Sequence, residues 1–374
     1  MSAPQPRPGI LEIRPYVGGE SHLPGHDRVI KLASNESALG PSPRAVAAYR
    51  ATAATMHRYP DGDALELRQA LGARYGLDPA RIVCGAGSDE LIHFLCRAFA
   101  GEGDEVLYTR HGFAIFPIAA QACGARPVAA AERDLTASVD ELLACVTPRT
   151  KLLFLANPNN PTGTYIPADE VVRLRAGLRD DILLVLDSAY AEFVGANDYT
   201  AGIELVDAGV NTVMTRTFSK IYAMGGVRLG WAYCPAPVAD VLNRVRGPFN
   251  VSSAALAAGK AALEDTGFAA LARRHNDYWR PWLAAELAKI GIPTTPSVAN
   301  FVLARFPTTP GSDAAAANAF LKSHGIIVRA MGGYHLPDCL RITVGTGDEN
   351  QALVEALTEF QAQANAQASA KAAP

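Results

Sequence analysis

Short apolar segments alternate with helix-like patterns from about residue 60 to residue 235, and this alternation limits the possible folds more than any other feature of the chain. Continuous apolar runs predict strands that are buried on both faces, with helices between them that return the chain to the same sheet. We therefore expect a mainly parallel α/β sheet flanked by helices. The predicted strands are 82–84, 105–108, 152–156, 182–186, 212–216 and 230–233, and helices are predicted at 91–99, 115–123 and 168–178.

The pattern changes after about residue 245, where helices become longer and strands shorter. This change predicts a second, smaller α+β domain. Residues 10–40 hold no complete α/β unit, so we expect the N-terminal segment to join that smaller domain. The expected organisation is an N-terminal segment (1–40), a large α/β domain (41–250), a small C-terminal α+β domain (251–362) and a flexible tail (363–374).

Composition excludes several classes of function. The 374 residues are 49% hydrophobic, which is enough for a large core and more than one domain. The net charge is −3 and the basic residues are scattered, so we expect no nucleic-acid surface. No apolar run reaches the ~18 residues of a membrane span, and no signal peptide is evident. Six dispersed cysteines indicate reduced thiols and a cytoplasmic protein, and no metal-ligand spacing is present.

Three of the predicted strands end on polar residues. Asn157 follows the strand at 152–156, Asp187 follows the strand at 182–186, and Lys220 lies just beyond the strand at 212–216. In a parallel α/β sheet, ligands bind beyond the carboxyl ends of the strands, so one pocket can collect these residues. An amine nucleophile, a carboxylate and an amide are groups that a pyridoxal-phosphate (PLP) site requires.

Each of these residues has a candidate role towards PLP. Lys220 is the candidate for covalent attachment to the aldehyde, and Asp187 for the anion that keeps the ring nitrogen protonated. Asn157 and Tyr190 are candidates for donation to the ring hydroxyl oxygen. The alternatives are that Lys220 lies on the surface, that Asp187 caps a helix or turn, that Asn157 belongs only to a turn cluster, and that Tyr190 is a packed, half-buried side chain.

A glycine-rich turn at residues 84–90, between a predicted strand and a helix, favours phosphate because backbone N–H groups and the helix dipole meet there. The turn lacks the third glycine of a dinucleotide fingerprint. Thr217, Ser219 and Arg228 are candidate side-chain donors to the same phosphate, and arginine suits this role because its fork binds two oxygens. Phe113 either stacks on the cofactor ring or belongs to the core.

Arg341 lies in the middle of a predicted strand, between Leu340 and Ile342. A buried arginine needs an anionic or polar partner, and a substrate α-carboxylate is one such partner. The alternative is a structural ion pair. Arg329 is a second candidate of the same kind, and Tyr59 is expected on an exposed loop.

Five motifs resemble those of one family, and together they span most of the chain. The chain resembles the fold-type I PLP aminotransferases and, within them, the histidinol-phosphate aminotransferases, from about residue 14 to residue 350. The motifs are Arg-Tyr-Pro-Asp-Gly (58–62), Asn-Pro-Asn-Asn-Pro-Thr-Gly (157–163), Thr-Phe-Ser-Lys (217–220), Val-Arg-Leu-Gly (227–230) and Leu-Pro-Asp-Cys-Leu-Arg-Ile-Thr-Val-Gly-Thr (336–346).

The resemblance implies a role for each candidate residue. Lys220 carries the cofactor, Asp187 faces the ring nitrogen, and Asn157 and Tyr190 face the ring oxygen, with Phe113 in the stacking position. The residues implied around the cofactor phosphate are Ser88, Asp89, Thr217, Ser219 and Arg228.

Substrate binding and assembly are also implied by the resemblance. Arg341 and Asn35 would hold the substrate carboxylate, with Arg329 assisting and Tyr16 near the distal end of the substrate. Tyr59 would reach the phosphate of the neighbouring subunit, which implies a homodimer with shared active sites.

Two segments depart from the family pattern. Residues 221–226 read Ile-Tyr-Ala-Met-Gly-Gly where a Leu-Ala-Gly type of sequence is expected, and His335 stands where many members have glycine. Both departures bear on substrate choice rather than on the chemistry.

The resemblance implies a ping-pong amino transfer from L-histidinol phosphate to 2-oxoglutarate, which yields imidazole acetol phosphate and L-glutamate and belongs to histidine biosynthesis. The small-molecule partners are thus an amino donor and a 2-oxo acid. An aromatic aminotransferase acting on phenylalanine or tyrosine is the alternative on the same scaffold. Further alternatives are a PLP decarboxylase or C–S lyase, a nucleotide- or sugar-binding α/β protein, and a non-catalytic regulator.

Overall fold

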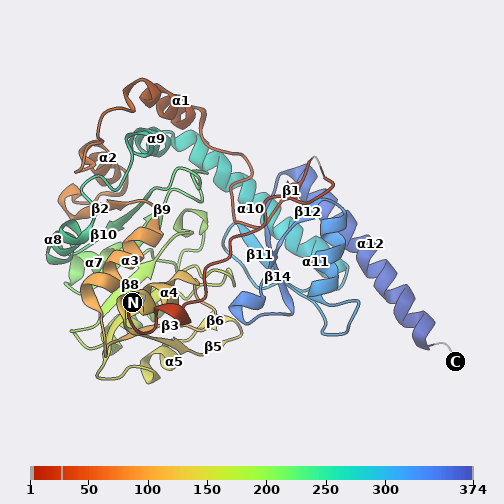
Figure 1. The fold of residues 1–374 in the computed structure, drawn as a ribbon. Coiled ribbons are helices and arrows are strands. Elements are labelled where there is room, and N and C mark those ends of the chain that lie inside the picture. The colour runs from red at the N-terminus through yellow and green to blue at the C-terminus, as the bar shows by residue number, and fades with distance from the viewer. Residues whose placement is uncertain (1–3, 27, 373–374) are drawn as a thin grey trace.

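The computed structural model describes residues 4–26 and 28–372. A larger part is built on a seven-stranded sheet and a smaller part on a three-stranded sheet. The long helix α10 (Thr266–Lys289) runs from the larger part to the smaller one (Figure 1).

The seven-stranded sheet confirms the α/β prediction. Its order is β2-β10-β9-β8-β7-β3-β4, and every neighbouring pair is parallel except the two that involve β10. Five consecutive parallel strands therefore place their carboxyl ends along one edge. The strands are β2 (Ile82–Gly85), β3 (Glu105–Thr109), β4 (Arg126–Ala130), β7 (Thr150–Ala156), β8 (Leu183–Asp187), β9 (Thr212–Thr217) and β10 (Gly230–Tyr233).

Helices cover both faces of this sheet, because alternate residues of each strand point to opposite sides. Phe154 of β7 packs in the core beneath one group of helices, whereas its neighbours Leu153 and Leu155 pack beneath another group. The first group is α3 (Ser88–Phe99), α4 (Ile115–Cys123) and α8 (Ala236–Val245). The other face carries α1 (Pro43–Ala51), α2 (Leu65–Tyr75), α5 (Val139–Ala144), α6 (Ala168–Gly177), α7 (Ile203–Ala208) and α9 (Ser253–Glu264).

A small hairpin, β5 (Glu132–Arg133) with β6 (Thr136–Ala137), follows β4 and lies outside the main sheet. Sequence patterns gave no expectation of it, because each strand has two residues and the turn contains no glycine. Its turn residues Asp134 and Leu135 both have a positive φ, of 49° and 58°.

The three-stranded sheet of the smaller part has the order β11 (Phe301–Arg305), β14 (Cys339–Thr343) and β13 (Arg329–Ala330), all antiparallel. It packs against α10 and α11 (Ala314–Ser323). Near the N-terminus, β1 (Ile30–Lys31) pairs in parallel with β12 (Ile326–Ile327), and this pairing joins chain segments nearly 300 residues apart.

The last helix is α12 (Gly347–Ala372). The tail that the sequence led us to expect from residue 363 is helical as far as Ala372, where this helix ends. The segment is rich in alanine and glutamine, which favour helix, and no glycine or proline interrupts it before Pro374. Residues 373–374 lie outside the described residues.

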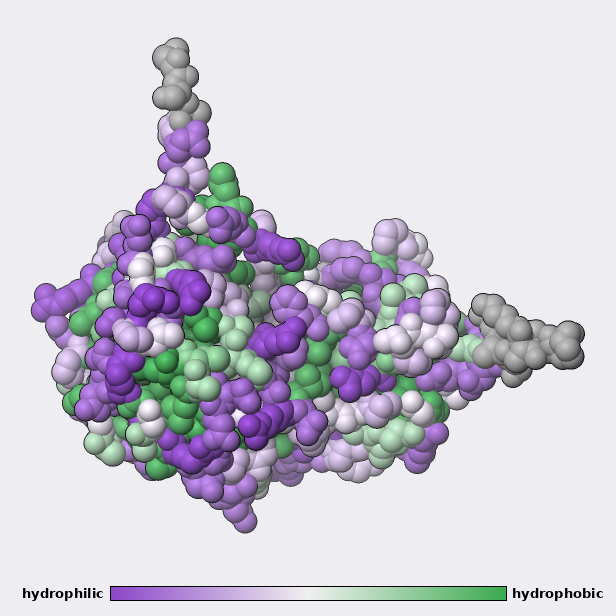
Figure 2. Space-filling model, turned by 90° about the horizontal axis from the view of Figure 1, so that it is seen from below, coloured by the Kyte–Doolittle hydropathy of each residue, from purple (hydrophilic) through white to green (hydrophobic). Residues whose placement is uncertain are grey.

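Hydrophilic and hydrophobic side chains are interspersed over the face shown in Figure 2. Among the residues that the structure describes, no helix combines the length and the apolar character that crossing a membrane requires.

Candidate active site

A cavity of about 270 Å³ lies at the carboxyl ends of the parallel strands, where the larger and smaller parts of the chain meet. Its wall brings together predicted residues that span more than three hundred positions of the chain. Those lining it are Tyr16, Asn35, Ser88, Asp89, Phe113, Asp187, Tyr190, Thr217, Ser219, Lys220, Arg228, Arg329 and Arg341. Asn157 and Tyr59, which the sequence also predicted, do not line it.

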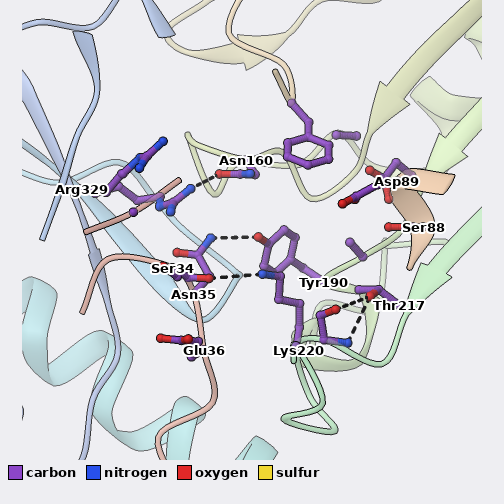
Figure 3. A pocket seen from close by; sticks show the side chains of 18 of the residues that line it. Ser34, Asn35, Glu36, Ser88, Asp89, Asn160, Tyr190, Thr217, Lys220 and Arg329 are labelled. Carbon is purple, nitrogen blue, oxygen red and sulfur yellow. Dashed lines mark hydrogen bonds between the residues drawn. The ribbon is translucent and has the colours of Figure 1, made fainter. Parts of the chain in front are cut away.

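Lys220 extends into the cavity from the loop after β9. Its Nζ lies 3.4 Å from the carbonyl oxygen of Ser34, and it is 5.8 Å from the ring centroid of Tyr190 (Figure 3). Burial and, after it, the nearby guanidinium of Arg341 lower the pKa of this amine to about 8. A larger share of the amine is therefore neutral near physiological pH, and the neutral amine is the form that attacks a carbonyl.

Asp187 ends β8 and is 4% exposed. The hydroxyl of Thr215 donates to its Oδ1 at 3.3 Å, and within residues 4–26 and 28–372 no lysine or arginine pairs with it. Burial, followed by the carboxylate of Asp89, raises the pKa of Asp187 to about 7. A buried carboxylate without a cation is costly, so this site fits a ligand that brings a positive charge, such as the protonated ring nitrogen of PLP.

An anion cradle lies across the cavity from Arg329, on the side where Figure 3 shows Ser88, Asp89 and Thr217. Ser88 is the first residue of α3, where free backbone N–H groups favour an anion. Nearby, the hydroxyl of Thr217 donates to Ser219 Oγ at 2.9 Å, and Nη1 of Arg228 lies 3.4 Å from the same oxygen.

Glycine makes room for this cradle. Gly87 precedes α3 with φ 91°, and a Cβ at that position would lie 2.1 Å from Nη2 of Arg228. Only glycine therefore lets the guanidinium of Arg228 sit over the start of α3. The same Nη2 lies 3.2 Å from Asp89, so a phosphate entering the cradle meets an arginine that one carboxylate already contacts.

The middle of the cavity holds a pair of hydrogen-bonding side chains. Nδ2 of Asn35 donates to the hydroxyl of Tyr190 at 2.8 Å. Both residues are buried, and burial raises the pKa of the Tyr190 hydroxyl, so it stays protonated and remains a donor. Tyr190 is thus in place for the predicted donation to a ring oxygen.

The prediction that Asn157 points into the site is wrong. Its side chain donates to the carbonyl oxygen of Ile166 at 3.0 Å and accepts from the backbone N–H of Ile166 at 2.9 Å. Asn160, three residues later, lines the cavity instead. The rule that strand ends supply ligands selects the first asparagine, whereas the turn after β7 carries the third one inward.

The smaller part contributes two adjacent arginines. Arg341 on β14 and Arg329 on β13 are directly paired residues of the antiparallel ladder, and both line the cavity. Nη2 of Arg329 donates to the carbonyl oxygen of Val17, and its guanidinium lies 6.0 Å from the ring centroid of Tyr16. Two neighbouring guanidiniums at one end of a cavity form a site for an anionic substrate group.

Arg341 is 6% exposed and unusually short of partners. Its Nη2 donates to the carbonyl oxygen of Ala33 at 2.8 Å and its Nη1 donates to Asn160 Oδ1. Its buried Nε has no hydrogen-bond partner, and in the described part of the chain no carboxylate pairs with the guanidinium. The alternative of a structural ion pair is therefore wrong, and the site is open to an external anion.

Two aromatic residues differ in how the structure places them. Phe113 lines the cavity and meets Phe116 edge to face at 5.9 Å. Tyr59 is 83% exposed and stacks on Phe249 at 4.7 Å, away from the cavity of its own chain.

Several cavity-lining residues had no signal in the sequence. Ser34 meets Lys220 through its backbone carbonyl, a contact that no motif can reveal. Glu36 lines the cavity and pairs with Lys31 at 2.9 Å. A metal site has no support in the described ranges, where no group of three or more His, Cys, Asp or Glu side chains could hold an ion.

Comparison with known proteins identifies the family of this arrangement. The family model described as aminotransferase class I and II matches residues 27–357. A histidinol-phosphate aminotransferase of Paramagnetospirillum magneticum is 69% identical over 96% of this chain and 99% of its own length. A protein of the same name from Rhodospirillum rubrum is 61% identical over 96% of this chain and 97% of its own length.

A solved structure agrees with these relatives. The histidinol-phosphate aminotransferase of Sinorhizobium meliloti, in complex with pyridoxal-5'-phosphate, matches with a TM-score of 0.88 and 31% sequence identity. The match covers 97% of this chain and 99% of that one.

Proposed function

The chain belongs to the family of class I and II aminotransferases, and from this premise we propose that it transfers the amino group of L-histidinol phosphate to 2-oxoglutarate. The products are imidazole acetol phosphate and L-glutamate, as in histidine biosynthesis. PLP is the cofactor, in keeping with the family and with the related structure that holds it.

The residues of the cavity fit PLP. When bound, PLP supplies an aldehyde for the incoming amine and a ring that accepts electrons. Lys220 would hold the aldehyde end, Asp187 the ring nitrogen, Tyr190 the ring oxygen, and the cradle around Arg228 the phosphate. The unpaired carboxylate of Asp187 and the space that Gly87 leaves for Arg228 support this assignment.

Lys220 would also act as the general base once the substrate amine had displaced it. Its amine, whose pKa burial lowers to about 8, would take the proton from the substrate Cα and deliver it to the C4′ carbon of the cofactor. Thr217 at the end of β9 and Ser219 just before Lys220 are joined by two hydrogen bonds, which fix the start of this loop and so keep the base within reach of the reacting carbon.

The single observation that carries the choice of substrate is the guanidinium of Arg341, which is buried, has an unpartnered Nε and lies beside Arg329. L-Histidinol phosphate has no carboxylate but carries a phosphate, whereas glutamate carries an α-carboxylate. We infer that Arg341 binds the α-carboxylate in one half-reaction and the phosphate in the other, with help from Tyr16 and Arg329. The 69% identity to a histidinol-phosphate aminotransferase supports the same substrate.

The test is a panel of amino donors assayed with 2-oxoglutarate and coupled to detection of glutamate. L-Histidinol phosphate, phenylalanine and tyrosine are compared by kcat/KM, with Lys220→Ala as the inactive control. We expect kcat/KM for L-histidinol phosphate to exceed that for either aromatic amino acid by at least about tenfold. Its phosphate can contact Arg329 as well as Arg341, and a second charged contact contributes about that much. A higher kcat/KM for phenylalanine or tyrosine would overturn it in favour of an aromatic aminotransferase.

We also propose that the protein acts as a cytoplasmic homodimer with shared sites. Tyr59 is exposed on its own protomer, and its ring stacks on Phe249. This position suits it to reach the cofactor phosphate of a neighbouring subunit. The large domain (41–250) then supplies the cofactor site, and the small domain (251–362) supplies the substrate arginines.

A further inference from the structure

Glu132 is a buried carboxylate that the reaction does not use. It lies on β5 of the small hairpin, and its side chain is 2% exposed. It accepts two hydrogen bonds from a single residue, at 3.1 Å from the backbone N–H of His111 and at 2.7 Å from Nδ1 of the same residue. Within the described ranges, no lysine or arginine lies within 4.0 Å of it.

His111 continues this chain of hydrogen bonds towards the cavity. Its carbonyl oxygen accepts from Nδ2 of Asn159 at 3.3 Å, and Asn159 directly precedes the cavity residue Asn160. Phe113, two residues after His111 in the sequence, also lines the cavity. Through His111, Glu132 therefore supports two parts of the cavity wall: the segment that carries Phe113 and the loop that carries Asn160.

The network closes on the hairpin itself. Nδ2 of Asn159 also donates to Thr162 Oγ1 at 3.0 Å, and this hydroxyl meets Thr164 Oγ1 at 2.8 Å. Thr164 in turn donates to the carbonyl oxygen of Leu135, at the tip of the hairpin, at 2.8 Å. The hairpin thus contacts both cavity loops, through Glu132 at one end of the hydrogen-bond series and Leu135 at the other, and this network resists movement of either loop.

We propose that Glu132 is a positioning residue for the cofactor. It fixes His111 and thereby holds Phe113 against the face of the bound PLP ring. The inference rests on the proposed placement of Phe113 at that ring. Charge-assisted hydrogen bonds to a single residue are strong and directional, and burial without them would be costly, so the pair defines one position for the 111–113 loop.

The test compares Glu132→Ala and Glu132→Gln with Glu141→Gln as the matched control. In the described part of the chain, the side chain of the nearby Glu141 makes a single ion pair, at the surface, with Arg133 at 3.3 Å. Three properties are measured for each variant: the Kd of PLP by absorbance titration, the visible circular dichroism per bound cofactor, and the denaturant midpoint without cofactor. None of them depends on the amino donor, so they stay valid if the proposed substrate is wrong.

Glu132→Ala is expected to raise the Kd of PLP about tenfold, the effect of losing one charged hydrogen bond, and to weaken the circular dichroism of the bound cofactor. Glu132→Gln, whose amide oxygen still accepts from His111, is expected to show a smaller change, and Glu141→Gln none. If Glu132→Ala does not fold, Glu132→Gln carries the same measurements.

A double variant distinguishes an effect of Glu132 on the position of Phe113 from an effect on the stability of the fold. In a Phe113→Leu background, Glu132→Gln is expected to add no further change in Kd or circular dichroism, because both substitutions act through the same ring contact. Two results would overturn the proposal. One is a lower denaturant midpoint for the Glu132 variants with cofactor affinity and circular dichroism unchanged, and the other is an undiminished effect of Glu132→Gln when Phe113 is absent.

Discussion

The guanidinium of Arg341, in the middle of β14, donates to the side-chain oxygen of Asn160 in the loop after β7. One hydrogen bond thus joins the three-stranded sheet to the seven-stranded sheet inside the cavity. Arg341 and Asn160 both line the cavity, so this bond sets the position of the substrate-binding arginines relative to the cofactor site of the larger part.

Replacing Arg341 tests its proposed double use. Arg341→Ala is expected to lower kcat/KM by about 100-fold for both glutamate and L-histidinol phosphate, because two charged hydrogen bonds contribute roughly 3 kcal/mol. Arg341→Lys keeps the charge but loses the fork, so most of the defect should remain. Single half-reactions monitored by cofactor absorbance provide the measurement. A defect confined to glutamate would show that the phosphate binds elsewhere.

Asp187 predicts a pH dependence for the cofactor-free protein. Its folded-state pKa of about 7 lies above the ordinary value of 3.8, so the folded state binds more protons than the unfolded state between these values. The free energy of unfolding should therefore fall as pH rises from about 4 to about 7, by at most roughly 1.4 kcal/mol per pH unit. Below about pH 4 the carboxyl group of Asp187 is protonated in both the folded and the unfolded state, and the cost of burying its charge disappears.

Asp187→Asn supplies the comparison for this prediction. Without cofactor, the variant should become progressively more stable than the wild type across the same pH range, as measured by denaturant unfolding. With PLP present, the order should reverse, because only the carboxylate pairs with a cationic ring nitrogen. A difference in the free energy of unfolding between the two proteins that stays constant from pH 4 to 7 would contradict the prediction.

Tyr59 allows a complementation test of shared sites. Tyr59→Ala and Lys220→Ala each damage a different half of a site if the two residues come from different subunits. After the subunits are mixed and allowed to exchange, half of the dimers are mixed, and each contains one intact site, so activity at limiting PLP should approach about a quarter of the wild-type value. Activity that stays at the average of the two separate variants would place Tyr59 outside the partner's site.

His335 is expected to store backbone strain. It has φ 61°, a left-handed conformation that glycine adopts at little cost and that a side chain with a Cβ adopts only at a penalty. His335→Gly should therefore raise the free energy of unfolding by about 0.5–1 kcal/mol. His324, with φ −98°, is the matched control, and glycine there should not stabilise. A lower stability for His335→Gly, measured by denaturant unfolding, would refute the argument.

The sequence predicted the sheet well, and the place of Asp187 at its edge, for a physical reason. Apolar runs such as 182–186 are long enough to identify a buried strand, and a polar residue directly after such a run, such as Asp187, is forced to the carboxyl edge. Lys220, which comes shortly after the strand at 212–216, follows from the same geometry. Both positions can be read from the local sequence pattern alone.

The remaining features depend on contacts that no local pattern encodes. Asn160 replaces Asn157 because the turn decides which of three asparagines faces inward. The hairpin that carries Glu132 is too short to produce a periodic signal. The departure at 221–226 is explained only by packing: Tyr222 is buried, and its hydroxyl meets that of Tyr75 at 2.9 Å.

All the roles proposed for the cavity depend on covalent binding of PLP by Lys220. Borohydride reduction of the PLP-loaded protein, followed by proteolysis and mass spectrometry of the peptide that contains residue 220, tests this binding. We expect the reduced cofactor on Lys220 alone, and no adduct in Lys220→Ala. Protein that remains unlabelled at Lys220, or that carries the adduct on another lysine, would contradict it.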